Sequence, residues 1–114
     1  MIDLERGSIV TVRLDPAEGR EIRKTRPAVI VSNDVACRFD AVIQVVPLTR
    51  LPDRELRPYE GRVGSAESGL AKPSRLVANQ IRTVSRQRIG EVLGRVSDVE
   101  EQEIDRALRI QLAL

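Results

Sequence analysis

Short apolar runs alternate along the chain with polar segments that contain glycine and proline. This pattern is typical of β-strands that are joined by turns. The segment that contains Pro58 and Gly61 predicts a weak edge strand, because proline cannot donate to a sheet ladder. The segment spacing predicts a small antiparallel β-barrel. The predicted strands cover residues 8–14, 28–32, 42–48, 57–63, 76–84 and 91–96.

A helical period replaces the strand pattern after Ser97, which opens the sequence S-D-V-E. In such a capping box the Ser97 hydroxyl accepts from the backbone of Glu100, and the Glu100 carboxylate returns to the backbone of Ser97. Acidic residues fill the first turns, where they suit the positive end of a helix. A structural C-terminal helix is therefore predicted, with an apolar stripe formed by Ile104, Ala107, Leu108 and Leu112.

Composition places the chain among ordinary globular proteins. Its 114 residues are 41% apolar and 32% charged, which predicts one folded domain, residues 1–114. The apolar runs are too short to span a membrane, and the N-terminal MIDLERG does not resemble a secretion signal. A cytoplasmic location is expected. The single cysteine, Cys37, is interpreted as a small buried apolar residue without a disulfide or zinc role.

Two absences limit the chemistry. The chain has no histidine, so a Ser-His-Asp triad, a histidine-based nuclease and a His-ligated metal are excluded. Its only aromatic residues are Phe39 and Tyr59, which disfavours a stacking platform for single-stranded nucleic acid. Acid–base chemistry must then use Glu or Asp, with Arg and Thr as donors to developing negative charge.

The most strongly charged segment is GREIRKTRPAVIVSND, residues 19–34. Its first part holds four cations and one acid, Glu21, on a chain whose formal net charge is only +2. Phosphate is the expected target of such a field. Pro27 favours an extended conformation for Arg26, which presents this side chain where the loop enters the strand. A solvated hairpin tip is the alternative reading of the same charges.

Four short motifs resemble the MazF/PemK family of toxin endoribonucleases, in matching order and spacing. They are Arg6-Gly7, LDPAEGREIRKTRPAVIVSND at 14–34, VVPLT at 45–49 and NQIRTV at 79–84. The resemblance extends to a closing helix with a leucine-rich end. It implies a mainly β fold, an SH3-like partly open antiparallel β-barrel with a C-terminal α-helix. It also implies sequence-specific cleavage of single-stranded RNA, including mRNA, without metal or cofactor.

The same resemblance implies roles for individual residues. Arg26 and Thr49 correspond to the catalytic pair, and Glu21 corresponds to an acid that some members carry in the flexible loop. Because the pKa of arginine is too high for a base, Glu21 or another acceptor must take the proton from the attacking 2′-hydroxyl. Each of these residues also has an ordinary structural explanation. The expected RNA-binding residues are Arg20, Arg23, Lys24, Asn33, Gln80 and Arg82.

The resemblance also implies partners and leaves alternatives open. A toxin of this kind acts as a homodimer and is inhibited by a cognate MazE-like antitoxin peptide. An acidic and apolar peptide that lies in the RNA groove would explain this inhibition. The surplus of apolar side chains at residues 108–114 favours pairing of two copies. The alternatives are a gyrase poison of the same fold and a non-catalytic SH3-like module that binds RNA.

Overall fold

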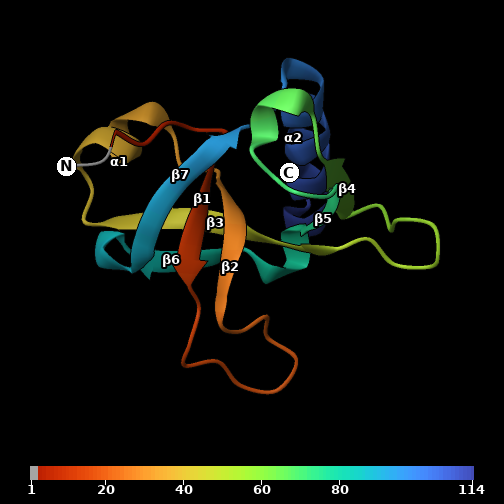
Figure 1. The fold of residues 1–114 in the computed structure, drawn as a ribbon, viewed down its shortest axis with the longest axis horizontal. Helices are drawn as coiled ribbons and strands as arrows, with labels where there is room; N and C mark the ends of the chain where they lie inside the picture. Colours follow the sequence, from red (N-terminus) through yellow and green to blue (C-terminus); the bar gives the residue numbers. More distant parts are fainter. Residues whose placement is uncertain (1–2) are drawn as a thin grey trace.

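The computed structural model describes residues 3–114. Seven strands, two α-helices and three short 3₁₀ turns follow one another along the chain (Figure 1). The elements are β1 (Ser8–Arg13), β2 (Thr25–Ile30), α1 (Asp34–Phe39), β3 (Val42–Arg50), β4 (Glu60–Val63), η1 (Ala66–Ser68), β5 (Ser74–Val77), η2 (Ala78–Gln80), β6 (Arg82–Ser85), η3 (Arg86–Arg88), β7 (Ile89–Arg95) and α2 (Asp98–Leu112).

The strands form one antiparallel, curved sheet in the order β4-β5-β3-β2-β1-β7, and β6 also pairs with β3. Strand β3 is the longest at nine residues, so it can pair with β2, β5 and β6 along different parts of its length. The sheet is not closed, since β4 and β7 end the path. This confirms the predicted mainly β, partly open barrel with a C-terminal helix.

Alternating side chains of the central strands build two cores. Val10, Ile30 and Val45 belong to one buried cluster, whereas the adjacent Val29 and Val46 belong to the other. This division follows from the two-residue period of a strand, which sends neighbouring side chains to opposite faces. The second cluster also receives residues of α2, which lies against β4 and η2 on one side of the molecule (Figure 1).

The C-terminal helix agrees with its predicted start. The Ser97 side chain accepts from the Glu100 backbone at 3.1 Å, and a Glu100 side-chain oxygen accepts from the Ser97 backbone at 2.9 Å. Ile104 and Ala107 are buried, as the apolar stripe predicts. Leu112 is different, because it is 48% exposed beyond the point where the sheet covers the helix.

Two local predictions need correction. The segment 76–84 is not one strand, because the η2 turn separates β5 from β6. A short helix, α1, was not predicted, although Asn33 caps it by accepting from the Ala36 backbone at 2.9 Å. Asparagine is a favoured N-cap residue because its side-chain oxygen satisfies an otherwise free N–H. No helix within residues 3–114 is long and apolar enough to cross a membrane.

Candidate functional site

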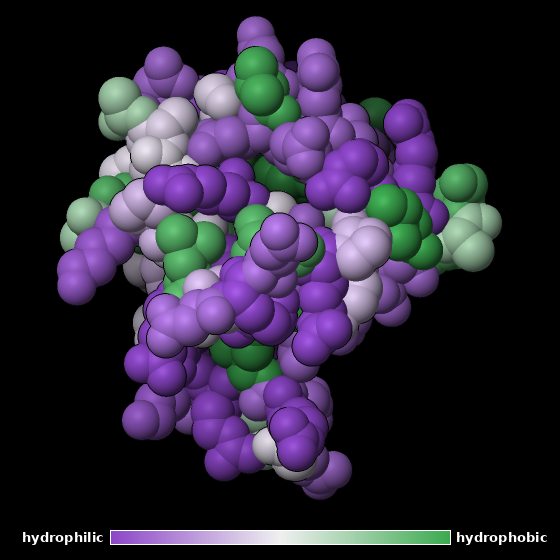
Figure 2. All heavy atoms as spheres, turned by 90° about the vertical axis from the view of Figure 1, so that its right-hand side faces the viewer, coloured by the Kyte–Doolittle hydropathy of each residue, from purple (hydrophilic) through white to green (hydrophobic). Residues whose placement is uncertain are grey.

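The basic loop, defined as residues 14–24, connects β1 to β2 and extends away from the sheet (Figure 1). Its stem is closed by two hydrogen bonds, from the Leu14 backbone to the Lys24 carbonyl at 2.9 Å and from the Lys24 backbone to Asp15 Oδ1 at 3.1 Å. Arg20, Arg23 and Lys24 are exposed. In space-filling view the loop is a narrow, mostly hydrophilic projection (Figure 2). Its cations are therefore accessible to a polyanion.

Gln80 and Arg82 fasten this loop to the rest of the molecule. The Gln80 side-chain amide donates to the Arg20 carbonyl at 3.2 Å and accepts from the Ile22 backbone at 3.2 Å. Arg82 donates to the Leu14 carbonyl at 2.5 Å. Both predicted RNA-binding residues thus lie against the loop, where they hold its backbone.

Arg26 and Thr49 belong to the neighbouring strands β2 and β3. The register pairs Ile30 with Val45 and Ala28 with Pro47 and ends there, and Arg26 and Thr49 lie two residues beyond this last pair in their own strands. Opposite residues in an antiparallel pair point to the same face of the sheet. Both side chains belong to partly exposed residues at the foot of the basic loop.

The Arg26 guanidinium is anchored on one side only. Its Nε donates to the Arg23 carbonyl at 3.2 Å. Within residues 3–114, no hydrogen bond or ion pair involves its two terminal nitrogens. The end of the guanidinium therefore remains able to bind a two-oxygen acceptor such as phosphate.

Glu21 and Asn33 lie away from Arg26 and Thr49. Glu21 is exposed near the tip of the basic loop, where its carboxylate accepts from the Glu18 backbone at 2.9 Å. No hydrogen bond in the described part of the chain joins it to Arg26 or Thr49. Asn33 caps α1 beyond the opposite end of β2 from Arg26, so the structure does not bring it next to the other predicted site residues.

A buried carboxylate lies close to this site, and the sequence did not reveal it. Glu60, at the start of β4, is 2% exposed and binds Arg54 at 2.8 Å and Arg75 at 2.9 Å. It also accepts from the Arg57 backbone at 2.8 Å. Arg75 is the register partner of Thr49. The partners of Glu60 are far apart in sequence and include no recognisable motif, so only the fold brings them together.

The charges around Glu60 determine its protonation. Burial raises the pKa of this carboxyl, but the Arg54 hydrogen bond, the Arg57 backbone N–H and the Arg75 charge together lower the pKa to about 2. Glu60 is therefore ionised throughout the physiological range, and the group of Glu60, Arg54 and Arg75 carries one surplus positive charge.

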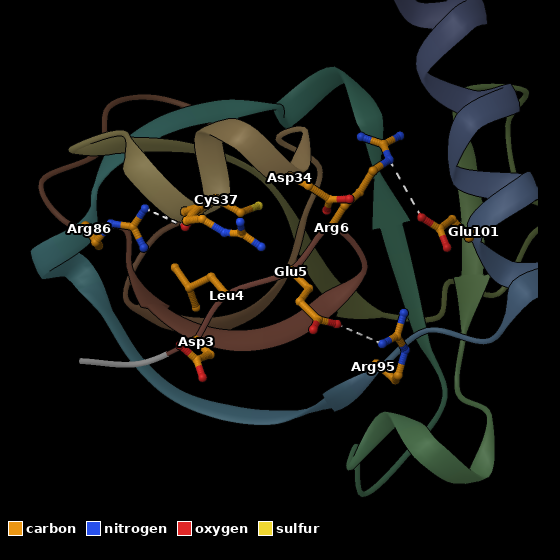
Figure 3. A pocket seen from close by; sticks show the side chains of 10 residues that line it. Asp3, Leu4, Glu5, Arg6, Asp34, Cys37, Arg86, Arg95 and Glu101 are labelled. Atoms are coloured by element: carbon orange, nitrogen blue, oxygen red, sulfur yellow. Dashed lines mark hydrogen bonds and ion pairs between the residues drawn. The ribbon is translucent and has the colours of Figure 1, made fainter.

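A hollow of about 720 Å³ lies at another part of the molecule, between the N-terminal segment, α1 and α2 (Figure 3). Its charged side chains are largely engaged with the protein itself. Arg95 pairs with Glu5 at 3.1 Å, and Arg6 lies 3.7 Å from Glu101. Arg86 donates to carbonyls of α1. This hollow contains none of the residues predicted for RNA cleavage.

Residues 5–112 match the model of the PemK-like, MazF-like toxins of type II toxin–antitoxin systems. The chain is also 38% identical to endoribonuclease MazF9 of Mycobacterium tuberculosis over 116 aligned positions, which cover 97% of this chain and 98% of the relative. The chain belongs to the MazF/PemK family of toxin endoribonucleases. The predicted resemblance is thereby confirmed.

Solved structures of similar proteins agree with this MazF/PemK assignment. A mycobacterial endoribonuclease in complex with its cognate antitoxin superposes with a TM-score of 0.80 at 26% identity, covering 97% of this chain and 96% of the other. MazF from Deinococcus radiodurans has the same fold, with a TM-score of 0.84 at 21% identity and complete coverage of both chains.

Proposed function

We propose that this MazF/PemK chain is a toxin that cuts single-stranded RNA, including mRNA, at short specific sequences without a metal ion. The observation that supports the proposal is the β2–β3 pairing, in which Arg26 and Thr49 both lie two residues beyond the pair of Ala28 with Pro47, next to an exposed cationic loop that precedes Arg26. The arginine supplies a two-pronged donor, the threonine supplies a hydroxyl, and the loop supplies positive charge for the RNA backbone.

The proposed reaction is an internal transfer at phosphorus. The 2′-oxygen of one nucleotide attacks the adjacent phosphodiester, and the 5′-oxygen of the next nucleotide leaves and takes up a proton from water. One product has a 5′-hydroxyl, and the other has a cyclic phosphate that water can open. Arg26 donates to the nonbridging oxygens as negative charge grows on them, and Thr49 donates to the same phosphate.

Proton transfer completes this scheme. The 2′-hydroxyl proton needs an acceptor, and we assign this role to the Glu21 carboxylate. Glu21 is exposed in the basic loop and is not bonded to Arg26 or Thr49, so the loop must bring the carboxylate to the bound RNA. Closing of such loops on substrate is common in enzymes. Glu21→Gln should then slow cleavage without weakening RNA binding.

RNA binding extends from the reacting phosphate along the loop. Arg20, Arg23 and Lys24 contact neighbouring phosphates in this proposal, since all three are exposed. Gln80 and Arg82 contribute by holding the loop and by lining its base. In this proposal these five residues and the Arg26 and Thr49 pair together bind the RNA.

Asn33 lies apart from this surface. Its side-chain oxygen is occupied by the cap of α1, which leaves only its amide N–H groups for a ligand. An RNA contact there requires a strand long enough to pass the far end of β2. Asn33 is therefore expected to affect RNA affinity less than the loop cations.

We further propose a homodimer and a cognate MazE-like antitoxin. Three apolar side chains near the C-terminus are strongly exposed, namely Ile110 at 47%, Leu112 at 48% and Leu114 at 85%. Pairing of two copies would cover them. The similar mycobacterial endoribonuclease was solved with its antitoxin, and an acidic peptide would suit the basic loop here. Both partners and mRNA would meet in the cytoplasm.

Cleavage of a long single-stranded RNA by pure protein in EDTA tests the proposal. Wild type should give fragments with 5′-hydroxyl ends and leave duplex RNA and DNA intact. Arg26→Ala should slow cleavage by about 10²-fold or more, because it removes a donor to the transition state. Arg38→Ala is a matched control, since Arg38 is exposed on α1 outside the proposed site.

Three results would contradict the proposal. One is loss of all cleavage in EDTA with recovery on adding magnesium. Another is gyrase inhibition by protein that leaves every RNA intact, which would favour the gyrase-poison alternative. The third is a protein that binds RNA but never cuts it, which would favour the non-catalytic module.

A further inference from the structure

The pairing of β3, β5 and β4 places two more arginines in line with the proposed site. Thr49 pairs with Arg75, and Arg75 pairs in turn with Arg62. Paired residues of antiparallel strands share a face, so Thr49, Arg75 and Arg62 form a row across β3, β5 and β4. Neighbouring strands are about 4.8 Å apart, so the backbones of Thr49 and Arg75 are separated by about that distance. Arg26 lies in β2, on the other side of β3 from β5.

Arg75 is held in this row by the buried carboxylate of Glu60. The contact joins Arg75 Nη1 and Glu60 Oε2 at 2.9 Å. The other carboxylate oxygen of Glu60 binds Arg54 at 2.8 Å and the Arg57 backbone at 2.8 Å. Arg54 also donates a second hydrogen bond, to Oε2 at 3.2 Å. With four N–H groups donating to it, the carboxylate is firmly held, and its bond to Arg75 restrains the direction of that side chain.

One part of the Arg75 guanidinium remains without a partner. Its Nε is buried and makes no hydrogen bond to any residue in the range 3–114. A buried donor without an acceptor is destabilising. The Arg75 side chain as a whole is 21% exposed, so another part of it can be reached from the solvent. A phosphate would bind the solvent-accessible part of the guanidinium, not the buried Nε.

We propose that Arg75 binds an RNA phosphate next to the one that is cut, and that Glu60 is the positioning residue that aims it. This inference rests on the proposed function. RNA phosphate fits because a guanidinium binds two phosphate oxygens at once, and because the group of Glu60, Arg54 and Arg75 has a surplus positive charge. Arg26 and Arg75 would then hold the RNA backbone on both sides of Thr49.

The competing explanation is a structural clamp. Arg54 lies in the connection between β3 and β4, and its bond to Glu60 fastens that connection to the sheet. Arg75 could serve only to balance the buried charge of Glu60. A clamp affects stability and leaves the salt dependence of RNA binding unchanged, whereas a phosphate contact releases a counterion and changes that dependence.

The test measures RNA affinity at several salt concentrations. The probe is a synthetic single-stranded RNA that spans one cleavage position mapped with wild type, with a 2′-deoxynucleotide at that position to prevent cutting. Arg75→Ala should weaken binding about tenfold, as loss of a charged hydrogen bond does. It should also reduce the slope of log K against log salt by about 0.7, the value for one phosphate contact on a single strand.

Glu60 is tested through its dependence on Arg75. Glu60→Gln should weaken binding while it keeps the wild-type salt slope, because Arg75 is still present. Adding Glu60→Gln to Arg75→Ala should cause no further loss of affinity, since the positioned group is already absent. Arg54→Ala is the matched control, because it removes the other ligand of the same carboxylate. It should keep the wild-type slope.

The inference is overturned if the Arg75→Ala variant folds and keeps the wild-type RNA affinity and salt slope. Arg75 would then act only as part of the structural clamp. If this variant does not fold, Arg75→Lys and Arg75→Gln replace it, and equal salt slopes for the two would overturn the inference. Failure of this inference can be told apart from failure of the proposed function, because in the second case wild type itself does not cut RNA. The inference alone is rejected if wild type cuts RNA, Arg26→Ala does not, and Arg75→Ala binds RNA with wild-type affinity.

Discussion

Protonation of Glu60 should remove a measurable part of the folding free energy in acid. The pKa of this carboxyl is about 2 in the folded protein, against 4.5 when it is unperturbed. One pKa unit corresponds to 1.36 kcal/mol, so the ionised group contributes about 3 kcal/mol to stability. Because the folded pKa is the lower one, the contribution is complete above about pH 5 and is lost as the pH falls toward 2.

Glu60→Gln isolates this contribution from that of the other carboxylates. The variant should be less stable than wild type by about 3 kcal/mol near neutral pH, because it leaves two arginines without their anion. The difference between the two proteins should shrink by about 2 kcal/mol between pH 6 and pH 3. Urea unfolding followed by far-UV circular dichroism measures both free energies.

Glu103→Gln provides the matched control. Glu103 pairs with Arg106 at 3.0 Å on the exposed side of α2, and such surface pairs contribute about 0–1 kcal/mol. The free energy of unfolding of this variant should stay close to that of wild type at every pH. The reasoning is refuted if the Glu60→Gln difference does not change between pH 6 and pH 3.

Three more predictions concern other parts of the fold. Gly69→Ala should destabilise by about 2 kcal/mol or more in urea unfolding, since Gly69 has φ +71 and an added Cβ would lie 2.0 Å from a β7 carbonyl oxygen; Gly61→Ala, with open space around it, should be mild. Gln80→Ala should increase the rate of trypsin cleavage in the basic loop by roughly 5- to 30-fold, because two hydrogen bonds that hold the loop are lost. An unchanged rate would show that these hydrogen bonds do not restrain the loop. Leu112→Glu should shift sedimentation from dimer toward monomer, whereas Gln111→Glu should not.

Sequence patterns predicted those elements whose signals are local. The capping box at Ser97 marks the start of α2 because both of its hydrogen bonds lie within one helical turn. The β1 strand was also predicted within one residue, since its polar and apolar residues alternate. In both cases neighbouring residues contain the information that determines the structure.

Elements that depend on distant contacts were not predicted correctly. The η2 turn interrupts an alternating pattern, and Gln80 within it binds the basic loop some sixty residues earlier. Helix α1 has only six residues, too few for a clear helical period. Its cap, Asn33, was interpreted from the sequence as an RNA contact, which stays a prediction, and its capping role was not predicted.

The candidate site shows the same division. The resemblance predicts the catalytic roles of Arg26 and Thr49, and these roles stay predictions. Glu60, Arg54 and Arg75 escaped notice because their significance lies in a buried contact between three separate segments. No spacing rule connects these segments along the chain.

The central claim is cleavage by 2′-hydroxyl attack at the Arg26 and Thr49 site. Its most direct test compares two synthetic single-stranded RNAs in EDTA, identical except for one 2′-deoxynucleotide on the 5′ side of the mapped cleavage position. Wild type should cut the all-RNA strand to leave a 5′-hydroxyl and should not cut the substituted strand, while Arg26→Ala should cut neither at a comparable rate. Equal cutting of both strands by wild type would contradict the account.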